Sequence, residues 1–123
     1  MKRLRGSDAF TIYSETPTSP FVTLKVAIYQ PVDASDIPTF TDIKNFVKAN
    51  IARQGVRASL RIMRVPFDLH HPVWVADGDF SPENHIFQAE LPPPGTKAQL
   101  CDFISDLLGK PLDPDRPLWE VWS

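Results

Sequence analysis

Hydrophobic and polar positions along the chain follow two different periods, and the first of them predicts a β-strand. Residues 23–29 alternate with a period of two, with Leu24, Val26 and Ile28 on one side. This alternation is typical of a half-buried strand, and Pro31 closes the segment because proline cannot donate to a strand ladder.

Further strands are expected in the second half of the chain. Residues 60–65, 73–76 and 85–91 are short apolar segments of this kind, and Asp77-Gly78-Asp79 predicts the turn between the last two. Residues 118–122 also alternate like a strand. A chain that stops on such a segment exposes aromatic side chains and an unpaired strand edge, so we expect the fold to continue past Ser123.

The second period, close to 3.6 residues, predicts two main helices. The first begins at Thr39, repeats apolar residues up to Ile51 and ends at Gly55. The second begins with a capping box formed by Thr96 and Gln99. Its buried stripe consists of Leu100, Phe103, Ile104, Leu107 and Leu108, and Gly109 marks its end.

A short docking helix, capped by Ser7 and running to Tyr13, precedes these elements. The pattern therefore predicts an α/β fold of the α+β kind, with a mixed sheet, at least four strands in all and two main helices. The 13 prolines fall mostly at element boundaries. At 123 residues, the whole of 1–123 is expected to form a single domain.

Composition and charge exclude several classes of protein. The net charge is −2, and lysine and arginine are scattered, so no nucleic-acid surface is expected. No apolar segment approaches the ~20 residues of a membrane span, and the basic residues 2–5 are followed by Gly6-Ser7-Asp8 and not by an apolar signal core, so we expect a cytoplasmic chain. We expect Lys2, Arg3 and Arg5 to form a solvated tail, and the single cysteine, Cys101, to be buried in its helix.

The residues that could support chemistry give no complete catalytic site. His70-His71 followed by Asp77-Gly78 resembles the acyl-transfer motif His-His-x-x-x-Asp-Gly, but five residues, not three, separate the two pairs. A structural role for both histidines, held by backbone and packing at the start of a strand, is the better interpretation. Asp113 and Asp115 flank Pro114 in a segment typical of turns.

Metal and cofactor sites are not predicted. The three histidines, His70, His71 and His85, have no helical i, i+4 spacing and no cysteine pair beside them. The chain also has no glycine-rich phosphate loop.

Several blocks resemble one enzyme family in consecutive order along the whole chain. The opening residues 1–29 look like the start of a bacterial wax ester synthase/diacylglycerol acyltransferase. The later blocks are VPFDLHHPVWVADGDF at 65–80, LPPPGTKAQLCDFI at 91–104 and PLDPDRPLWEVW at 111–122. The last is the most specific, because Pro117-Leu118-Trp119 matches the family's Pro-Leu-Trp motif residue by residue.

The resemblance implies a fold like that of chloramphenicol acetyltransferase, in which two similar halves enclose a substrate channel. This chain would be the amino-terminal part of the first half. The family transfers an acyl group from acyl-CoA, its co-substrate, to diacylglycerol or a fatty alcohol. Its catalytic His-His-x-x-x-Asp-Gly motif would fall beyond Ser123, which implies that this chain has no catalytic residue and is inactive alone. Pro117, Leu118 and Trp119 are then the only site candidates, near the substrate channel.

Two other interpretations stay open. The chain could be a non-catalytic lipid- or acyl-CoA-binding or assembly module that pairs with another chain. A condensation-type domain of peptide synthesis shares the two-half architecture, but the opening residues and the Pro-Leu-Trp block argue against it. We also expect self-association or pairing with the missing half, since half-domain surface stays uncovered. Peripheral contact with a membrane or a lipid droplet stays open.

Overall fold

The computed structural model describes residues 2–123 and has a mixed α/β architecture, as the sequence predicts. The helices are α1 (Gly6–Ser14), α2 (Phe40–Gln54) and α3 (Lys97–Leu108). The strands are β1 (Lys2–Arg3), β2 (Leu60–Met63), β3 (Val73–Ala76), β4 (Ile86–Phe87) and β5 (Val121–Trp122). None of the helices described is long and apolar enough to cross a lipid bilayer.

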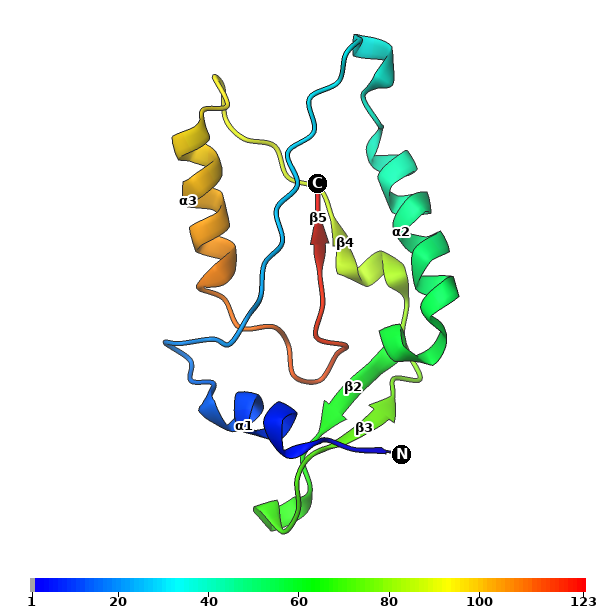
Figure 1. Ribbon diagram of the computed structural model, residues 1–123, viewed down its shortest axis with the longest axis vertical. Coiled ribbons are helices and arrows are strands. Elements are labelled where there is room, and N and C mark those ends of the chain that lie inside the picture. Colours follow the sequence, from blue (N-terminus) through cyan, green and yellow to red (C-terminus); the bar gives the residue numbers. More distant parts are fainter. Residues whose placement is uncertain (1) are drawn as a thin grey trace.

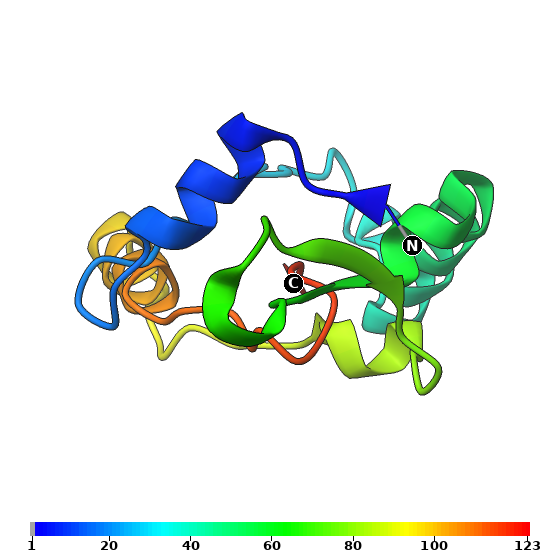
Figure 2. The ribbon, with the colours of Figure 1, turned by 90° about the horizontal axis from the view of Figure 1, so that it is seen from below.

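The strands form two small sheets. In the first, β3 lies between β1 and β2 and is antiparallel to both, with Lys2 opposite Trp74 and Leu60 opposite Ala76. In the second, β4 and β5 are parallel, with Ile86 opposite Val121. A parallel pair needs a crossover connection, which α3 supplies. Helices α2 and α3 flank the β4–β5 pair on opposite sides, and α1 lies beside the β2–β3 hairpin (Figures 1 and 2).

Capping and terminating residues place the two main helices where the sequence predicts them. Thr39 and Asp42 form a capping box on α2, in which the Asp42 carboxylate accepts from the Thr39 amide at 2.9 Å. Hydrogen bonds from Thr39 hold the pKa of Asp42 below its usual value. Gly55 ends α2 with a φ of 63°, a conformation that favours glycine. The box predicted for Thr96 and Gln99 is present at the start of α3.

The strand predicted at 23–29 is wrong. This segment crosses the face of the molecule in an extended conformation, but among residues 2–123 no strand pairs with it (Figure 1). Alternation indicates which side chains share a face, whereas a strand also needs a neighbouring backbone to accept its hydrogen bonds. The apolar side chains consequently stay exposed, 78% for Ile28 and 72% for Tyr29.

Other predicted boundaries need smaller corrections. The N-cap position of α1 is Arg5, which makes no side-chain capping bond, and not Ser7, which lies inside the helix. The strand predicted at 60–65 ends at Met63, and those predicted at 85–91 and 118–122 are reduced to β4 and β5.

Cys101 is exposed, so the prediction of a buried thiol is wrong. It lies seven residues before Leu108 and therefore on the same face of α3, at the edge of the apolar stripe, where Leu108 is also exposed. The rest of the stripe, Leu100, Phe103, Ile104 and Leu107, is half-buried.

The buried core is small for a chain of this length. It includes Leu4, whose amide donates to the Pro72 carbonyl at 2.9 Å, together with Ala9, Ala58 and Ile86. The accessible surface is 9408 Å², whereas a compact monomer of this mass exposes about 6,700 Å². A large share of apolar surface therefore lacks a covering element among the residues described.

Candidate substrate-channel site around Trp119

The segment that carries the Pro-Leu-Trp block is held by a tight turn just before it. The Asp113 carboxylate accepts from the Asp115 amide at 2.9 Å, and its other oxygen lies 3.6 Å from Arg116 Nε. The Arg116 amide also donates to the Asp113 carbonyl. The Asp113 carboxylate therefore serves the turn, as the sequence predicts, and Asp115 contributes its backbone amide.

Trp119 is fixed by three separate contacts. Its indole Nε1 donates to the Ala58 carbonyl at 2.8 Å. Its own carbonyl accepts from His85 Nδ1 at 2.9 Å, and because a carbonyl can only accept, this nitrogen carries the proton. The His85 ring also stacks on the indole, with centroids 4.6 Å apart and planes inclined by 25°. These contacts leave the Trp119 side chain little freedom to reorient.

His85 is the partner that sequence reasoning missed. It lies in a 3₁₀ turn, Pro82–His85, and is only 4% exposed. The sequence predicts a strand that begins at this residue, and nothing in the local pattern indicates a contact with a residue 34 positions away. Phe80 completes the aromatic group, with its ring centroid 6.1 Å from that of Trp119.

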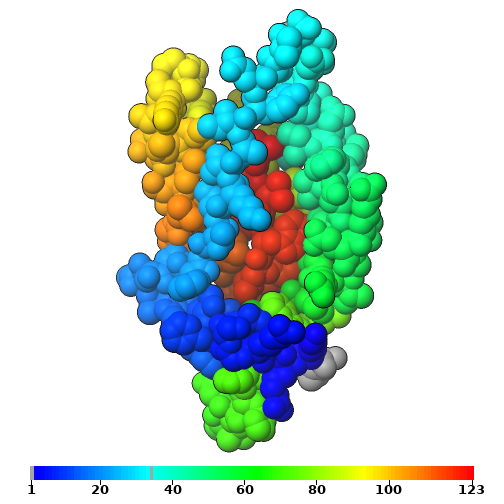
Figure 3. Space-filling model, in the orientation of Figure 1, coloured from blue at the N-terminus to red at the C-terminus, as the bar shows by residue number. Residues whose placement is uncertain are grey.

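A groove of about 570 Å³ opens beside Trp119. Val47 and Ile51 of α2 form one wall, and Trp119 and Val121 form the other. In the space-filling view the surface of the last residues, in red, lies recessed between α2 and the segment 21–30 (Figure 3). We call this hollow the apolar groove.

The three predicted site residues differ from one another in whether they line the apolar groove. Trp119 is half-buried and lines the apolar groove, whereas Pro117 is buried and Leu118 is half-buried, and neither is among the residues that line it. Trp119 is the member of the block whose side chain a bound molecule in the groove would meet.

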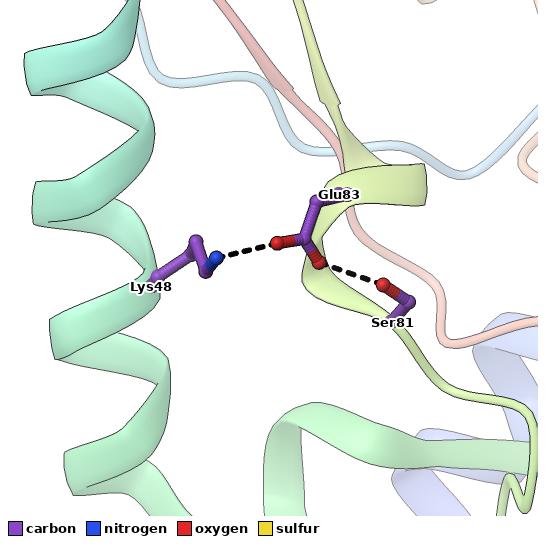
Figure 4. Close-up of polar contacts among 3 residues, drawn as sticks. All are labelled: Lys48, Ser81 and Glu83. Atoms are coloured by element: carbon purple, nitrogen blue, oxygen red, sulfur yellow. Dashed lines mark hydrogen bonds and ion pairs between the residues drawn. The ribbon is translucent and has the colours of Figure 1, made fainter.

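An ion pair connects the groove wall to the turn that carries His85. Lys48 of α2 donates to Glu83 Oε1, and Ser81 Oγ donates to Glu83 Oε2 at 2.7 Å (Figure 4). The bond from Lys48, followed by that from Ser81, lowers the pKa of Glu83 from 4.5 to about 2. The pair thus ties α2 to the turn that supports Trp119.

Glu83→Gln should remove an acid-sensitive part of the stability. Since the folded-state pKa lies below the ordinary value, the ion pair stabilises the fold above pH 4.5, and this contribution is lost as the pH falls from 4.5 to about 2. Thermal unfolding should show wild type melting above Glu83→Gln at pH 7 and together with it near pH 2. Both side chains are over a third exposed, so the difference should be small and should shrink with salt.

Glu90→Gln is the matched control, because Glu90 is exposed and belongs to neither ion pair found within residues 2–123. A Glu83→Gln profile that ran parallel to wild type at every pH would contradict this role for the pair.

His70 and His71 do not line the apolar groove. Both are exposed, and the packing expected for them is limited to a ring contact of His71 with Tyr13, whose centroids lie 6.1 Å apart. His71 Nδ1 lies 3.5 Å from the Tyr13 hydroxyl, and the two histidines line an open hollow with Arg3 and Tyr13.

Asp77 does not face either of these histidines. It follows the other end of β3 and lines a different hollow with His85. The length of strand between Pro72 and Asp77 corresponds to roughly 16 Å. Within residues 2–123 no group of three or more histidine, cysteine or acidic side chains is arranged to hold a metal ion.

Comparison with known proteins points to one family. The model of the wax ester synthase/diacylglycerol acyltransferase catalytic domain matches residues 4–123. A Mycobacterium tuberculosis protein named as a diacylglycerol O-acyltransferase is 35% identical over 124 residues, which cover 99% of this chain and 24% of that protein. Another protein from the same organism, also named as a diacylglycerol O-acyltransferase, is 49% identical over 70 residues. These residues cover 57% of this chain and 14% of that protein.

A solved structure with the same fold extends the comparison. The wax ester synthase/diacylglycerol acyltransferase from Marinobacter aquaeolei VT8 matches with a TM-score of 0.66 and 23% identity, over 99% of this chain and 29% of that one. The likeness agrees with the expected half-domain of a two-half fold. The chain spans about a quarter of the length of the curated relatives that match it throughout.

Proposed function

Because the chain belongs to the wax ester synthase/diacylglycerol acyltransferase catalytic domain family, we propose that it forms the amino-terminal part of an O-acyltransferase. The intact enzyme would move an acyl group from acyl-CoA to diacylglycerol or a fatty alcohol. The observation that carries the proposal is the family match over almost the whole chain, and the relatives named as diacylglycerol O-acyltransferases support it.

The proposed reaction needs a general base. An imidazole takes the proton from the acceptor hydroxyl, the oxygen attacks the thioester carbonyl, and the C–S bond breaks to release coenzyme A, whose sulfur regains a proton. In this chain, His85 Nδ1 is bonded to the Trp119 carbonyl, and His70 and His71 are separated from Asp77 by β3. These placements support the proposal that residues 1–123 do not catalyse the transfer alone.

Pro117, Leu118 and Trp119 are proposed to lie at the substrate channel. The position of Trp119 on the wall of the apolar groove supports this, because channels for acyl chains are lined by apolar and aromatic side chains. Pro117 and Leu118 would then act by holding the backbone on which Trp119 is presented.

The purified chain should show no acyl transfer above a no-enzyme control. The assay supplies palmitoyl-CoA with diacylglycerol in one arm and hexadecanol in the other, and follows release of free thiol together with formation of the ester. Ester formation that depends on the chain would overturn the inactive part of the proposal while leaving the family assignment intact.

The second candidate function is a non-catalytic module that binds lipid or acyl-CoA and pairs with another chain. The uncovered apolar surface of the fold favours it. Pull-down from an extract of the source cells distinguishes the two functions. The non-catalytic module requires a separate partner chain that carries His-His-x-x-x-Asp-Gly, whereas the acyltransferase part does not.

Association is part of both proposals. The exposed apolar side chains and the free edges of the two small sheets support self-association, or pairing with the half that completes the channel. Peripheral contact with a membrane or lipid droplet is proposed as well, because diacylglycerol and fatty alcohols reside in lipid.

A further inference from the structure

The loop that joins β2 to β3 projects from the rest of the molecule. In the space-filling view this loop, in green, forms the lowest part of the surface, below the N-terminal residues in blue (Figure 3). Phe67 is 93% exposed and Leu69 is 71% exposed. Large apolar side chains gathered at the end of a projecting loop mark a surface that contacts a membrane or another molecule. We call residues 66–69 the tip.

The backbone of the tip adopts a conformation that phenylalanine disfavours. The Asp68 amide donates to the Val65 carbonyl at 3.0 Å, which closes a four-residue turn with Pro66 in its second position. Phe67, in the third position, has a φ of 59°, and Asp68 has a φ of 49°. Glycine or asparagine is favoured at such a position, because a bulky side chain crowds the backbone. An almost fully exposed phenylalanine gains little packing in return, which points to a contact made with a partner.

Basic side chains flank the base of the tip. Arg3 of β1 and Met63 of β2 both lie opposite Val73 of the central strand. Arg64, which follows Met63, is therefore close to the level of Arg3, on the other side of β3. Both arginines are exposed, and neither belongs to an ion pair found within residues 2–123. Their charges are available to an external anion.

Tyr13 of α1 extends this surface on one side of the tip. Its hydroxyl lies 3.5 Å from His71 Nδ1, and its side chain lines an open hollow together with Arg3 and Leu69. Asp68 is the one acidic residue in that lining. An aromatic ring with a polar end is favoured at the boundary between membrane and water. The hollow thus brings an apolar, an aromatic and a basic side chain together beside the tip.

We propose that the tip docks on an anionic lipid bilayer. Phe67 and Leu69 insert at the level of the headgroups and upper acyl chains, while Arg3 and Arg64 bind lipid phosphates. Apolar insertion and attraction to anionic lipid add to each other, and stable attachment at a membrane surface usually needs both. A bilayer fits better than a protein partner, because a stable protein interface takes about 20 residues or more from each side and the tip is a narrow projection.

The proposal assigns a surface to the peripheral membrane contact proposed above, and in this respect it rests on the proposed function. Its test measures vesicle binding without acyl transfer. A negative result for the tip therefore leaves the acyltransferase assignment standing.

Phe67→Asn should lower the vesicle partition coefficient by about tenfold, because the apolar surface that the ring buries in lipid is lost. Sedimentation with vesicles of equal parts phosphatidylcholine and phosphatidylglycerol measures this coefficient. The free energy of unfolding in urea should not fall, since asparagine suits the positive φ of the turn. A purely structural role of Phe67 would instead lower stability and leave vesicle binding unchanged. Val32→Ser is the matched control, because Val32 is 91% exposed and lies outside the tip.

The contribution of charge is tested separately. Arg64→Gln should lower binding to the mixed vesicles by about fivefold. Wild type should bind phosphatidylcholine alone more weakly than the mixed vesicles, and its binding to the latter should fall as salt is added.

Three results would overturn the proposal. The first is wild-type binding by Phe67→Asn or an equal loss in Val32→Ser. The second is the absence of any wild-type binding to the mixed vesicles. The third is a lower mass of Phe67→Asn than of wild type in light scattering without lipid, which would show that the tip binds a second copy of the chain.

Discussion

Replacing Trp119 with alanine should lower the free energy of unfolding by about 3 kcal/mol, measured by urea denaturation. The substitution removes the indole from the stack with His85 and leaves the Ala58 carbonyl without its donor. It also leaves a cavity where the indole packs against His85. The loss of an aromatic side chain with both packing and hydrogen bonds explains the large effect.

Two companion variants separate the contributions. Trp119→Phe keeps an aromatic ring against His85 but removes the indole donor, and should cost about 1 kcal/mol. Phe10→Ala removes an aromatic side chain that is 67% exposed on α1, and should change stability by about 0.5 kcal/mol or less. If Trp119→Ala cost no more than Phe10→Ala, Trp119 would not be the anchor of this region.

The purified chain should associate at high concentration through the segment 21–29. Light scattering coupled to gel filtration should give a mass above the 13.9 kDa of one chain, rising with concentration. In this segment Phe21, Val26 and Ile28 are 60%, 52% and 78% exposed, and no strand described in residues 2–123 pairs with its backbone. Burial of such side chains together with pairing of the backbone favours a complex.

Ile28→Lys should reduce the association constant by about tenfold, because an apolar side chain is lost from the contact and a charge must be desolvated. Thr23→Lys adds the same charge to the same segment at an exposed polar position and is the matched control. A strictly monomeric wild type at every concentration, or equal effects of the two variants, would contradict the role of this segment.

The parts of the fold that the sequence predicted are those specified by neighbouring residues. Helices α2 and α3 follow from their apolar periods and from capping residues three positions apart, and the strands of the β2–β3 hairpin follow from two short apolar segments close in the chain. The segment 23–29 has an equally clear pattern, but whether it pairs depends on a distant backbone that its own residues do not specify.

In the candidate site, too, the sequence predicts what neighbouring residues specify and misses what depends on distant residues. Trp119 was selected through the Pro-Leu-Trp block, whereas its partners Ala58 and His85 are 61 and 34 positions away. Arg57 was not selected either, because its place beside Trp119 in the lining of the apolar groove depends on the tertiary fold. Lys2, Arg3 and Arg5 were expected to form a solvated tail, but Lys2 and Arg3 form β1, which pairs with β3 although the two strands are far apart in the chain.

The two sheets differ in the order in which they can assemble. The β2–β3 pair closes across residues 64–72, whereas the parallel β4–β5 pair closes across residues 88–120, including all of α3. The longer loop costs about 1 kcal/mol more in chain entropy, and its contacts become favourable only after α3 has formed. We therefore expect the hairpin to form first and the wall that presents Trp119 to be completed after it.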